Sequence, residues 1–470
     1  LTIEKVFTDK DYTDAWLSNT YSYLRGQNQD VGGKESVPTN FADDIYWADW
    51  NNEGNGKYTN GSYYSFFRNV EYNENWYQDS YKASYLGINK ACVFLNNIHM
   101  NQQLTDEERA DYAAQARFVR AYYYWLLLRK YGPIPLIPDE GEDYMQDYDG
   151  LARPRNTYDE CVEYITSELV KAAQDLPLER GTNNIARPTR GAALAARAKV
   201  LLYAASPLMN GNTDSYAQQM VDDKGNRLLA AEYDESKWAR AAAAAARDVM
   251  ELPGNNDGHR YQLYVKSRIT SGTEDYPETI EPFKDRNFSE NNWPYGYADI
   301  DPFESYRSVF NGELSAYENP ELIFSRVDNI TVDNSSGGIT SPDAIANMVL
   351  HQLPTLAGGW GVHGMTQKQC DAYYMNDGTD CPGKDKEIGR GDGSSRLTGY
   401  VTSDDVDAGR YKPLRAGVSL QYANREPRFY ASVGFNGSVW NMTSLGNKQG
   451  ATQPNQQVWY YRGTSEGYNG

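Results

Sequence analysis

The segment that most constrains the fold covers residues 104–138 and reads LTDEERADYAAQARFVRAYYYWLLLRKYGPIPLIP. Thr105 and Glu108 have the spacing of a capping box, in which each side chain bonds the other residue's backbone amide. Apolar and aromatic side chains then recur at the spacing of one buried helix face, at Ala114, Phe118, Ala121, Tyr122, Trp125 and Leu128. Gly132-Pro133 ends the helix, because proline cannot continue the hydrogen-bond ladder. The segment predicts a long core helix followed by a rigid, extended connector.

Further helical patterns lie on both sides of this segment. Before it, the sequence predicts a helix capped by Thr8 that runs through Trp16, and a helical stripe from Tyr77 to Leu95. After it, the capping box Thr157–Glu160 begins one helix, and an alanine-rich helix covers 192–205. A last helix is capped by Ser236 and stopped at Pro253-Gly254. Helix pairs with short connections, and alanines where backbones approach closely, are typical of a helix-turn-helix solenoid of the tetratricopeptide kind. An irregular helical domain is the alternative.

The character of the chain changes after Gly254. We expect a helical scaffold over 1–254 with an early aromatic loop at 26–60, a loop-rich ligand-binding region over 255–430, and a short C-terminal segment over 431–470. Weak alternation at Phe429, Ala431, Val433 and Phe435 suggests a hairpin there. The predicted fold class is mainly α: a TPR-like superhelical scaffold with a large irregular insertion and little β structure.

The charge balance excludes two classes of partner. A net charge of −19 lacks the basic surface on which nucleic-acid binding and attachment to anionic membranes both depend. No apolar run reaches the roughly 18–20 residues that a membrane span requires. The 39 tyrosines and 10 tryptophans favour recognition surfaces instead, because these side chains combine an apolar face with a polar group.

The chain offers little chemistry for catalysis, and we predict no enzyme and no cofactor. Its four histidines lack metal-ligand spacing, and no G-x-S-x-G motif is present. Structural calcium could be held by Asp9-x-Asp11-x-x-Asp14 or Asp405-x-Asp407, although solvated acidic surfaces are the favoured reading. Cys92 and Cys161 are expected as buried thiols. Whether Cys370 and Cys381 form a disulfide is left open.

Aromatic residues in loops are the candidates for ligand contact. Sugar rings present C–H patches that stack on indole or phenol faces, while their hydroxyls bind Asn, Asp, Arg and Gln. The candidate ligand-binding residues fall in three places. The cluster 46–51 contributes Trp47, Trp50 and Asn51, and the cluster 291–297 contributes Trp293, Tyr295 and Tyr297. Trp360, between two glycines, is the last candidate. A tryptophan in a loop more often covers the core, so that alternative stands for each. Trp16, Trp125 and Trp238 lie on helical stripes and are expected in the core.

Several ordered motifs resemble the SusD/RagB family. They are ARFVRAYYY at 116–124 followed by RKYGPIPL at 129–136, then RPTRGAA at 187–193 and AKVLLYAA at 198–205, and finally REPRFY at 425–430. The resemblance implies four TPR-like helix pairs with a variable, loop-built ligand face. It also implies a signal peptide and a lipidated cysteine upstream of Leu1, a place on the outer surface of Bacteroidetes such as Bacteroides, and C-terminal helices that this sequence lacks.

The function that this resemblance implies is capture without catalysis. Family members bind oligo- or polysaccharide at the cell surface and deliver it to a SusC-like TonB-dependent outer-membrane transporter. A peptide-binding member of the same family is the first alternative, and its pocket would need fewer stacking aromatics. A surface glycosidase is the second alternative, and no sequence motif supports it.

Overall fold

The computed structural model describes residues 2–24, 45–47, 79–143, 145–255, 258–268, 290–325, 353–354, 356, 359, 361, 363–440, 456–461 and 463–464. The chain divides into two compact units. Unit 1 comprises 1–33, 73–262 and 322–342, and unit 2 comprises 34–72, 263–321 and 343–470. The expected domain boundaries at 254 and 430 stay a prediction beside this division.

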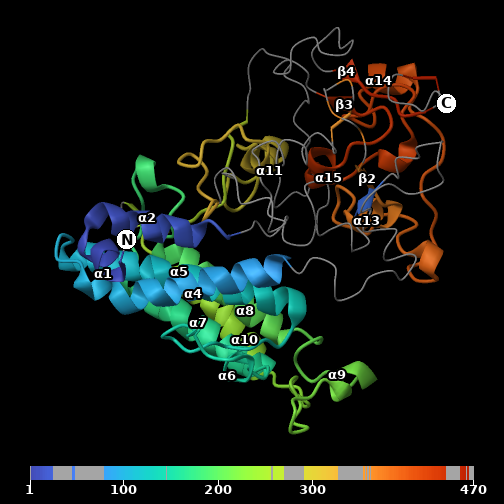
Figure 1. Cartoon of the computed structure of the whole chain (residues 1–470). Helices are drawn as coiled ribbons and strands as arrows, with labels where there is room; N and C mark the ends of the chain where they lie inside the picture. Colours follow the sequence, from blue (N-terminus) through green and yellow to red (C-terminus); the bar gives the residue numbers. More distant parts are fainter. Residues whose placement is uncertain are drawn as a thin grey trace. The chain divides into compact units, whose positions relative to one another are not determined.

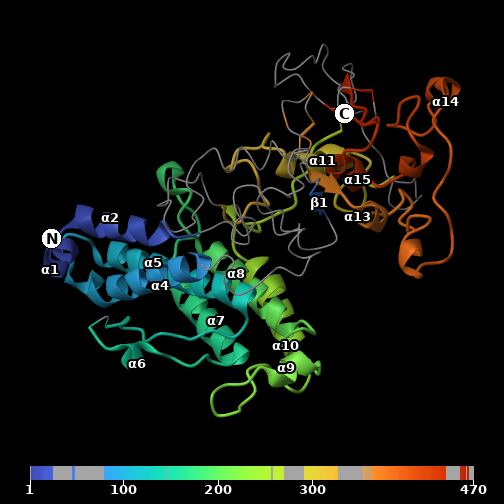
Figure 2. The same ribbon diagram turned by 45° about the vertical axis from the view of Figure 1, so that its right-hand side comes forward.

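Unit 1 is a layered array of helices, and the fold is mainly α (Figure 1). Its main helices are α1 (Ile3–Thr8), α2 (Lys10–Tyr21), α4 (Asp79–Asn97), α5 (Asp106–Tyr131), α7 (Tyr158–Asp175), α8 (Arg190–Ala205) and α10 (Ser236–Ala243), which continues as a π-helical turn, η4 (Ala244–Val249). Short helices are α6 (Tyr148–Leu151), α9 (Ser215–Gln219), η2 (Ile98–Met100) and η3 (Thr182–Asn184). Successive helices pack together, α2 on α4, α4 on α5, α5 on α7, α7 on α8, and α8 on α10 (Figure 2). Packing on sequence neighbours is the arrangement of helical repeats.

Helix ends follow local chemistry, with two corrections. The capping boxes at Thr105 and Thr157 are both present, and Gly132 ends α5 with a φ of 72°. Thr8, however, is the last residue of α1, and the Asp9 carboxylate caps α2 instead by accepting from Tyr12 N at 3.0 Å. Ser236 is the first residue of α10 rather than its cap, since its amide donates to the Asp234 carboxylate at 2.9 Å.

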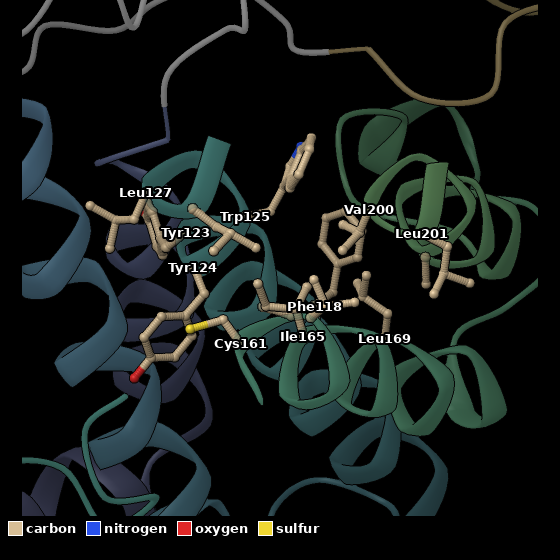
Figure 3. Close-up of a cluster of buried hydrophobic side chains, with 14 of the residues drawn as sticks. Phe118, Tyr123, Tyr124, Trp125, Leu127, Cys161, Ile165, Leu169, Val200 and Leu201 are labelled. Atoms are coloured by element: carbon tan, nitrogen blue, oxygen red, sulfur yellow. The ribbon is translucent and has the colours of Figure 1, made fainter. Parts of the chain in front are cut away.

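The core of unit 1 lies between α5, α7 and α8 (Figure 3). Side chains from all three helices meet there, among them Tyr124, Trp125, Ile165, Leu169 and Val200, each of them at most 1% exposed. Cys92 and Cys161 are buried thiols, as predicted. The expectation for Trp238 is wrong. Its side chain is 38% exposed, because it lies on an outward face of α10, at the edge of the described array.

Arginines of the motif segments fasten one helix to another. Arg117 and Arg120 on α5 both bind the Glu168 carboxylate on α7. Arg180 makes two hydrogen bonds of 2.8 Å to the Asp111 carboxylate on α5. Arg190 donates to the Ala173 carbonyl at 2.9 Å and so satisfies a free carbonyl in the last turn of α7.

Unit 2 has little regular structure in its described part. It contains α11 (Pro302–Phe310), α13 (Gln367–Ala372), η8 (Lys386–Ile388), α14 (Ser403–Asp407), η9 (Leu420–Tyr422) and α15 (Pro427–Ser432). Strand β1 (Ile45–Trp47) pairs antiparallel with β2 (His363–Met365), and β3 (Val439–Trp440) with β4 (Gln456–Gln457). The C-terminal segment thus holds an antiparallel strand pair. Phe429 and Ala431, expected in a strand, lie in α15 instead.

A buried arginine organises the core of unit 2. Arg425 is 2% exposed and donates to the carbonyls of Cys370 and Tyr373 at the end of α13. Its guanidinium lies 4.4 Å from the centroid of the Phe429 ring, and α15 begins directly after it with Pro427 in the first turn. Phe429 is itself fully buried beside Val418 and Phe435. Among the described residues, every helix is too short or too polar to span a bilayer.

Candidate ligand-binding site

The structure places four of the seven predicted site residues. Trp47 lies in β1, opposite His363 of β2. Trp293, Tyr295 and Tyr297 lie on one loop, residues 290–300, which leads into α11. The other three, Trp50, Asn51 and Trp360, lie outside the described residues.

The 290–300 loop presents two aromatic rings to solvent. Trp293 is 38% exposed and Tyr295 is 79% exposed. The backbone beneath them is held by hydrogen bonds within the loop, from Trp293 N to Asp299 Oδ1 at 2.8 Å and from Ala298 N to the Asn291 carbonyl at 3.0 Å. The two rings therefore stand on a closed loop, beside the exposed Asn291.

Tyr297 does not share this position. Its side chain is only 4% exposed, and Ile300, whose amide donates to the Tyr297 carbonyl, is buried as well. The loop turns back into unit 2 at this point, so that the Tyr297 ring belongs to the interior. This finding corrects the prediction that Tyr297 offers a face for stacking.

A pocket of about 250 Å³ lies farther along the chain in the same unit. One face of α11 lines it with Phe303 and Arg307, and the C-cap residue Asn311 continues the same line at a spacing of four residues. The remaining wall comprises Pro413, residues 430–435, Ser438, Val439 and Trp440. Sequence reasoning missed Trp440. The turn signal Asn436-Gly437 just before it, where Gly437 has a φ of 87°, could have marked this region.

The described lining of the pocket has one charged side chain, Arg307, and several polar groups among its aromatics. Arg307 binds Glu304 at 3.0 Å and Glu313 at 3.1 Å, so the one cation among the lining residues is already paired. Burial raises the pKa of Glu304, and the bond from Arg307 opposes that rise. Trp440 Nε1 donates to Ser438 Oγ at 3.1 Å, which fixes the indole against Gly434. Such a pocket suits an uncharged ligand better than an anion.

In each of the two acidic clusters considered for calcium, at least one carboxylate binds a protein partner. Asp14 pairs with Arg187 at 2.9 Å. Asp405 caps α14 by accepting from Thr402 and pairs with Arg410 at 2.7 Å, and these bonds lower its pKa to about 2. No group of three or more acidic, histidine or cysteine residues that could hold a metal occurs in the described part of the chain.

Comparison with known proteins identifies the family. Residues 14–202 match a family model described as "Starch-binding associating with outer membrane", and residues 320–470 match the model of the SusD family. The chain belongs to the SusD/RagB family. No match was found among curated proteins.

Solved structures agree with this SusD-family assignment at the level of the fold. A SusD-like protein from Bacteroides fragilis is 19% identical with a TM-score of 0.55, and the match covers 93% of this chain and 62% of that protein. A SusD-like carbohydrate binding protein from the same species is 17% identical with a TM-score of 0.51, covering 93% and 61%. A third structure is 21% identical with a TM-score of 0.63, covering 92% and 66%. The chain thus spans less than two thirds of each of these three proteins.

The SusD motifs themselves are structural in this chain. Arg117, Arg120 and Tyr124 of the first motif connect α5 to α7 and to the connector, and Arg425 of the last motif is buried in unit 2. The motifs that identify the SusD family therefore stabilise the fold, whereas the exposed aromatic residues that suit a ligand lie on the 290–300 loop.

Proposed function

We propose that this SusD-family protein binds oligo- or polysaccharide without catalysis. The observation that carries the proposal is the pair of exposed rings, Trp293 and Tyr295, on a loop closed by hydrogen bonds between its own residues. Flat aromatic faces bind the C–H surface of a sugar ring, and amide side chains such as that of Asn291 bind its hydroxyls. A loop that is already ordered loses little conformational entropy when the sugar binds.

Family membership supports the finer parts of the proposal. One matching family model is described as starch-binding and associated with the outer membrane, and one similar structure is of a carbohydrate binding protein. We place the protein on the outer-membrane surface, held by an N-terminal lipid, where it delivers glycan to a SusC-like TonB-dependent transporter. Glycoside hydrolysis requires a pair of carboxylates, and none stands among the described residues that line the pocket, which supports a binding role.

Affinity electrophoresis tests the proposal with gels that contain soluble starch, laminarin, xylan, pectin or mannan. We expect at least one polysaccharide to retard the protein. Trp293→Ala should weaken that binding about tenfold, because an aromatic stacking contact contributes about 1.5 kcal/mol. Trp238→Ala is the matched control, since Trp238 is equally exposed at 38% but lies on α10 of unit 1.

Two outcomes would favour the alternatives. If no polysaccharide retards the protein, the peptide-binding alternative becomes the better reading. If the protein releases reducing sugar from the polysaccharide that binds it, it is a glycosidase and the non-catalytic role is wrong.

A further inference from the structure

Besides the pocket in unit 2, a groove lies on the helical scaffold of unit 1. It has a volume of about 590 Å³, within the range of roughly 300–1,000 Å³ that is typical of ligand sites. Helix α4 forms one wall with Tyr81, Lys82, Tyr85 and Leu86. The connector after α5 forms the floor with Pro135 and Ile137. The segment 139–153, which contains α6 and is called the excursion below, forms the other wall with Glu142, Tyr148, Leu151, Ala152 and Arg153. We call this the α4–α6 groove.

Specific hydrogen bonds fix the excursion to α4. Asn96 Nδ2 on α4 donates to the Glu140 carbonyl at 2.9 Å, and Glu142 N donates to Asn89 Oδ1 at 3.0 Å. Between them Gly141 has a φ of 90°, and a Cβ there would lie 2.7 Å from Asn89 Oδ1, so only glycine fits. The excursion is therefore anchored to α4 before any ligand arrives.

Tyrosine rings dominate the accessible surface of the groove. Tyr148 is 84% exposed and Tyr81 is 37% exposed. The Tyr81 ring is braced from two sides, 4.8 Å from the Tyr85 ring and 5.2 Å, edge-on, from the Tyr131 ring. Tyr85 Oη donates to the Pro135 carbonyl at 2.7 Å, which fixes the next ring along α4. The groove thus offers one fixed ring and one freely exposed ring.

The backbone amides of the floor are already engaged, so they do not offer donors to an extended peptide. Leu136 N donates to Asn156 Oδ1 at 3.0 Å, Ile137 N donates to Tyr124 Oη at 3.1 Å, and the Ile134 carbonyl accepts from Asn156 N at 3.0 Å. Strand addition, which depends on main-chain hydrogen bonds, is therefore disfavoured here.

The charges of the groove also argue against an ionic ligand. Arg153 and Glu142 face each other in a two-point ion pair of 2.6 and 3.1 Å, so each neutralises the other. Lys82 is the other charged lining residue. A neutral ligand with a flat apolar face and many hydroxyls fits this surface best, and that description matches a sugar chain.

We infer that the α4–α6 groove is a second carbohydrate-binding site, in which Tyr81 and Tyr148 stack on sugar rings and Lys82 and the phenol hydroxyls bind sugar oxygens. The ligand class rests on the proposed function, whereas the site is independent of the 290–300 loop. A protein with two sites binds a long polysaccharide with higher avidity than a short fragment, provided that one polysaccharide molecule can reach both sites.

Affinity electrophoresis on the same five polysaccharides tests the groove with the whole protein. Tyr148→Ala and Tyr81→Ala should each weaken the retarding interaction severalfold, and the double variant should weaken it about tenfold or more. Tyr233→Ala is the control, because Tyr233 is 59% exposed in unit 1 but does not line the groove. Unchanged melting temperatures of the variants would show that they fold.

The outcomes separate the two proposals. Retardation that depends on Trp293 but not on Tyr81 or Tyr148 would overturn the groove and leave the proposed function in place. Retardation that depends on the two tyrosines but not on Trp293 would support the groove and remove the loop from the site. If no polysaccharide retards the wild type, both proposals fail. Tyr148-dependent binding of decaproline in that case would assign the groove to a proline-rich segment.

Discussion

Arg120 of α5 and Glu168 of α7 form an ion pair of 2.6 Å in which both residues are only 1% exposed. Arg117 approaches the same carboxylate at 2.7 Å and Lys171 at 2.9 Å. One buried anion thus joins two helices of the scaffold through three cations. Because its partners come from both helices, Glu168 fixes the position of α7 against α5.

Removing this charge should destabilise the protein strongly. Glu168→Gln leaves the buried guanidinium of Arg120 with only the longer, 3.3 Å pair to the exposed Asp139 carboxylate, and breaking a buried pair in this way costs about 3–5 kcal/mol. Urea unfolding followed by circular dichroism measures the change. Glu163→Gln is the control, since Glu163 is exposed and its pair with Arg240 has a length of 3.2 Å. Exposed pairs contribute at most about 1 kcal/mol, and equal losses in the two variants would contradict the argument.

The same carboxylate should make stability depend on acid pH. Burial alone would raise the pKa of Glu168, but hydrogen bonds from Arg120 and Lys171 and the charge of Arg117 lower it below its usual range. A group whose pKa is lower in the folded state stabilises the protein fully above its unfolded pKa, here near 4.5. That stabilisation is lost as the pH falls through the lower folded value.

Unfolding midpoints between pH 3 and pH 7 measure this effect. Wild-type stability should fall below about pH 4.5, and Glu168→Gln should show a shallower fall because it lacks the titrating group. Parallel pH profiles for the two proteins would show that Glu168 contributes nothing to the acid sensitivity.

Gly87 in α4 marks a point of close packing in the scaffold. A Cβ at Gly87 would lie 2.5 Å from Cζ of Tyr123, whose ring is fully buried and whose hydroxyl donates to the Thr20 carbonyl at 2.5 Å. Since that ring cannot move freely, Gly87→Ala should destabilise the protein by about 1–3 kcal/mol. Gly181→Ala has nothing within 4 Å of its Cβ and should be nearly neutral in thermal unfolding. A neutral Gly87→Ala would mean that α4 can shift away from α5.

Local signals predicted the scaffold well. The capping boxes at Thr105 and Thr157 and the break at Gly132 each depend on residues within one helical turn, and all three are present. The same locality explains the errors. Ser236 and Thr8 are good capping residues, but nearby carboxylates accept the amide hydrogen bonds instead. Asp234 accepts from Ser236 N, and Asp9 accepts from Tyr12 N.

The candidate site was less predictable, because exposure depends on tertiary structure. Trp238 has the helical spacing of a core residue yet lies on an outward face of α10, while Tyr297 has loop neighbours yet is buried. The pairing of Trp47 with His363 joins residues far apart in sequence, and no local pattern encodes such a register. Trp440 was missed for the same reason, since its pocket exists only where α11 and α15 pack together.

The four cysteines give a last, chemical prediction. All four are buried thiols, including Cys370 and Cys381, for which a disulfide had been left open. Burial raises the pKa of Cys161 and of Cys370 to about 11 and raises the pKa of Cys92 and Cys381 as well, although Arg120 beside Cys92 opposes the rise. Since only the thiolate reacts, the native protein should resist iodoacetamide at pH 8.

Mass spectrometry after alkylation in guanidinium, without a reductant, checks the state of the thiols. We expect four carbamidomethyl groups per chain under those conditions and almost none on the native protein. Two groups in the denatured, unreduced sample, rising to four after reduction, would show that one pair is oxidised. Cys370 and Cys381 are the pair to expect then. Both lie in unit 2, where Cys381 Sγ donates to Oδ1 of Asp371, the residue next to Cys370, at 3.9 Å. Cys92 and Cys161 instead bond separate carbonyls, those of Pro138 and Ile134.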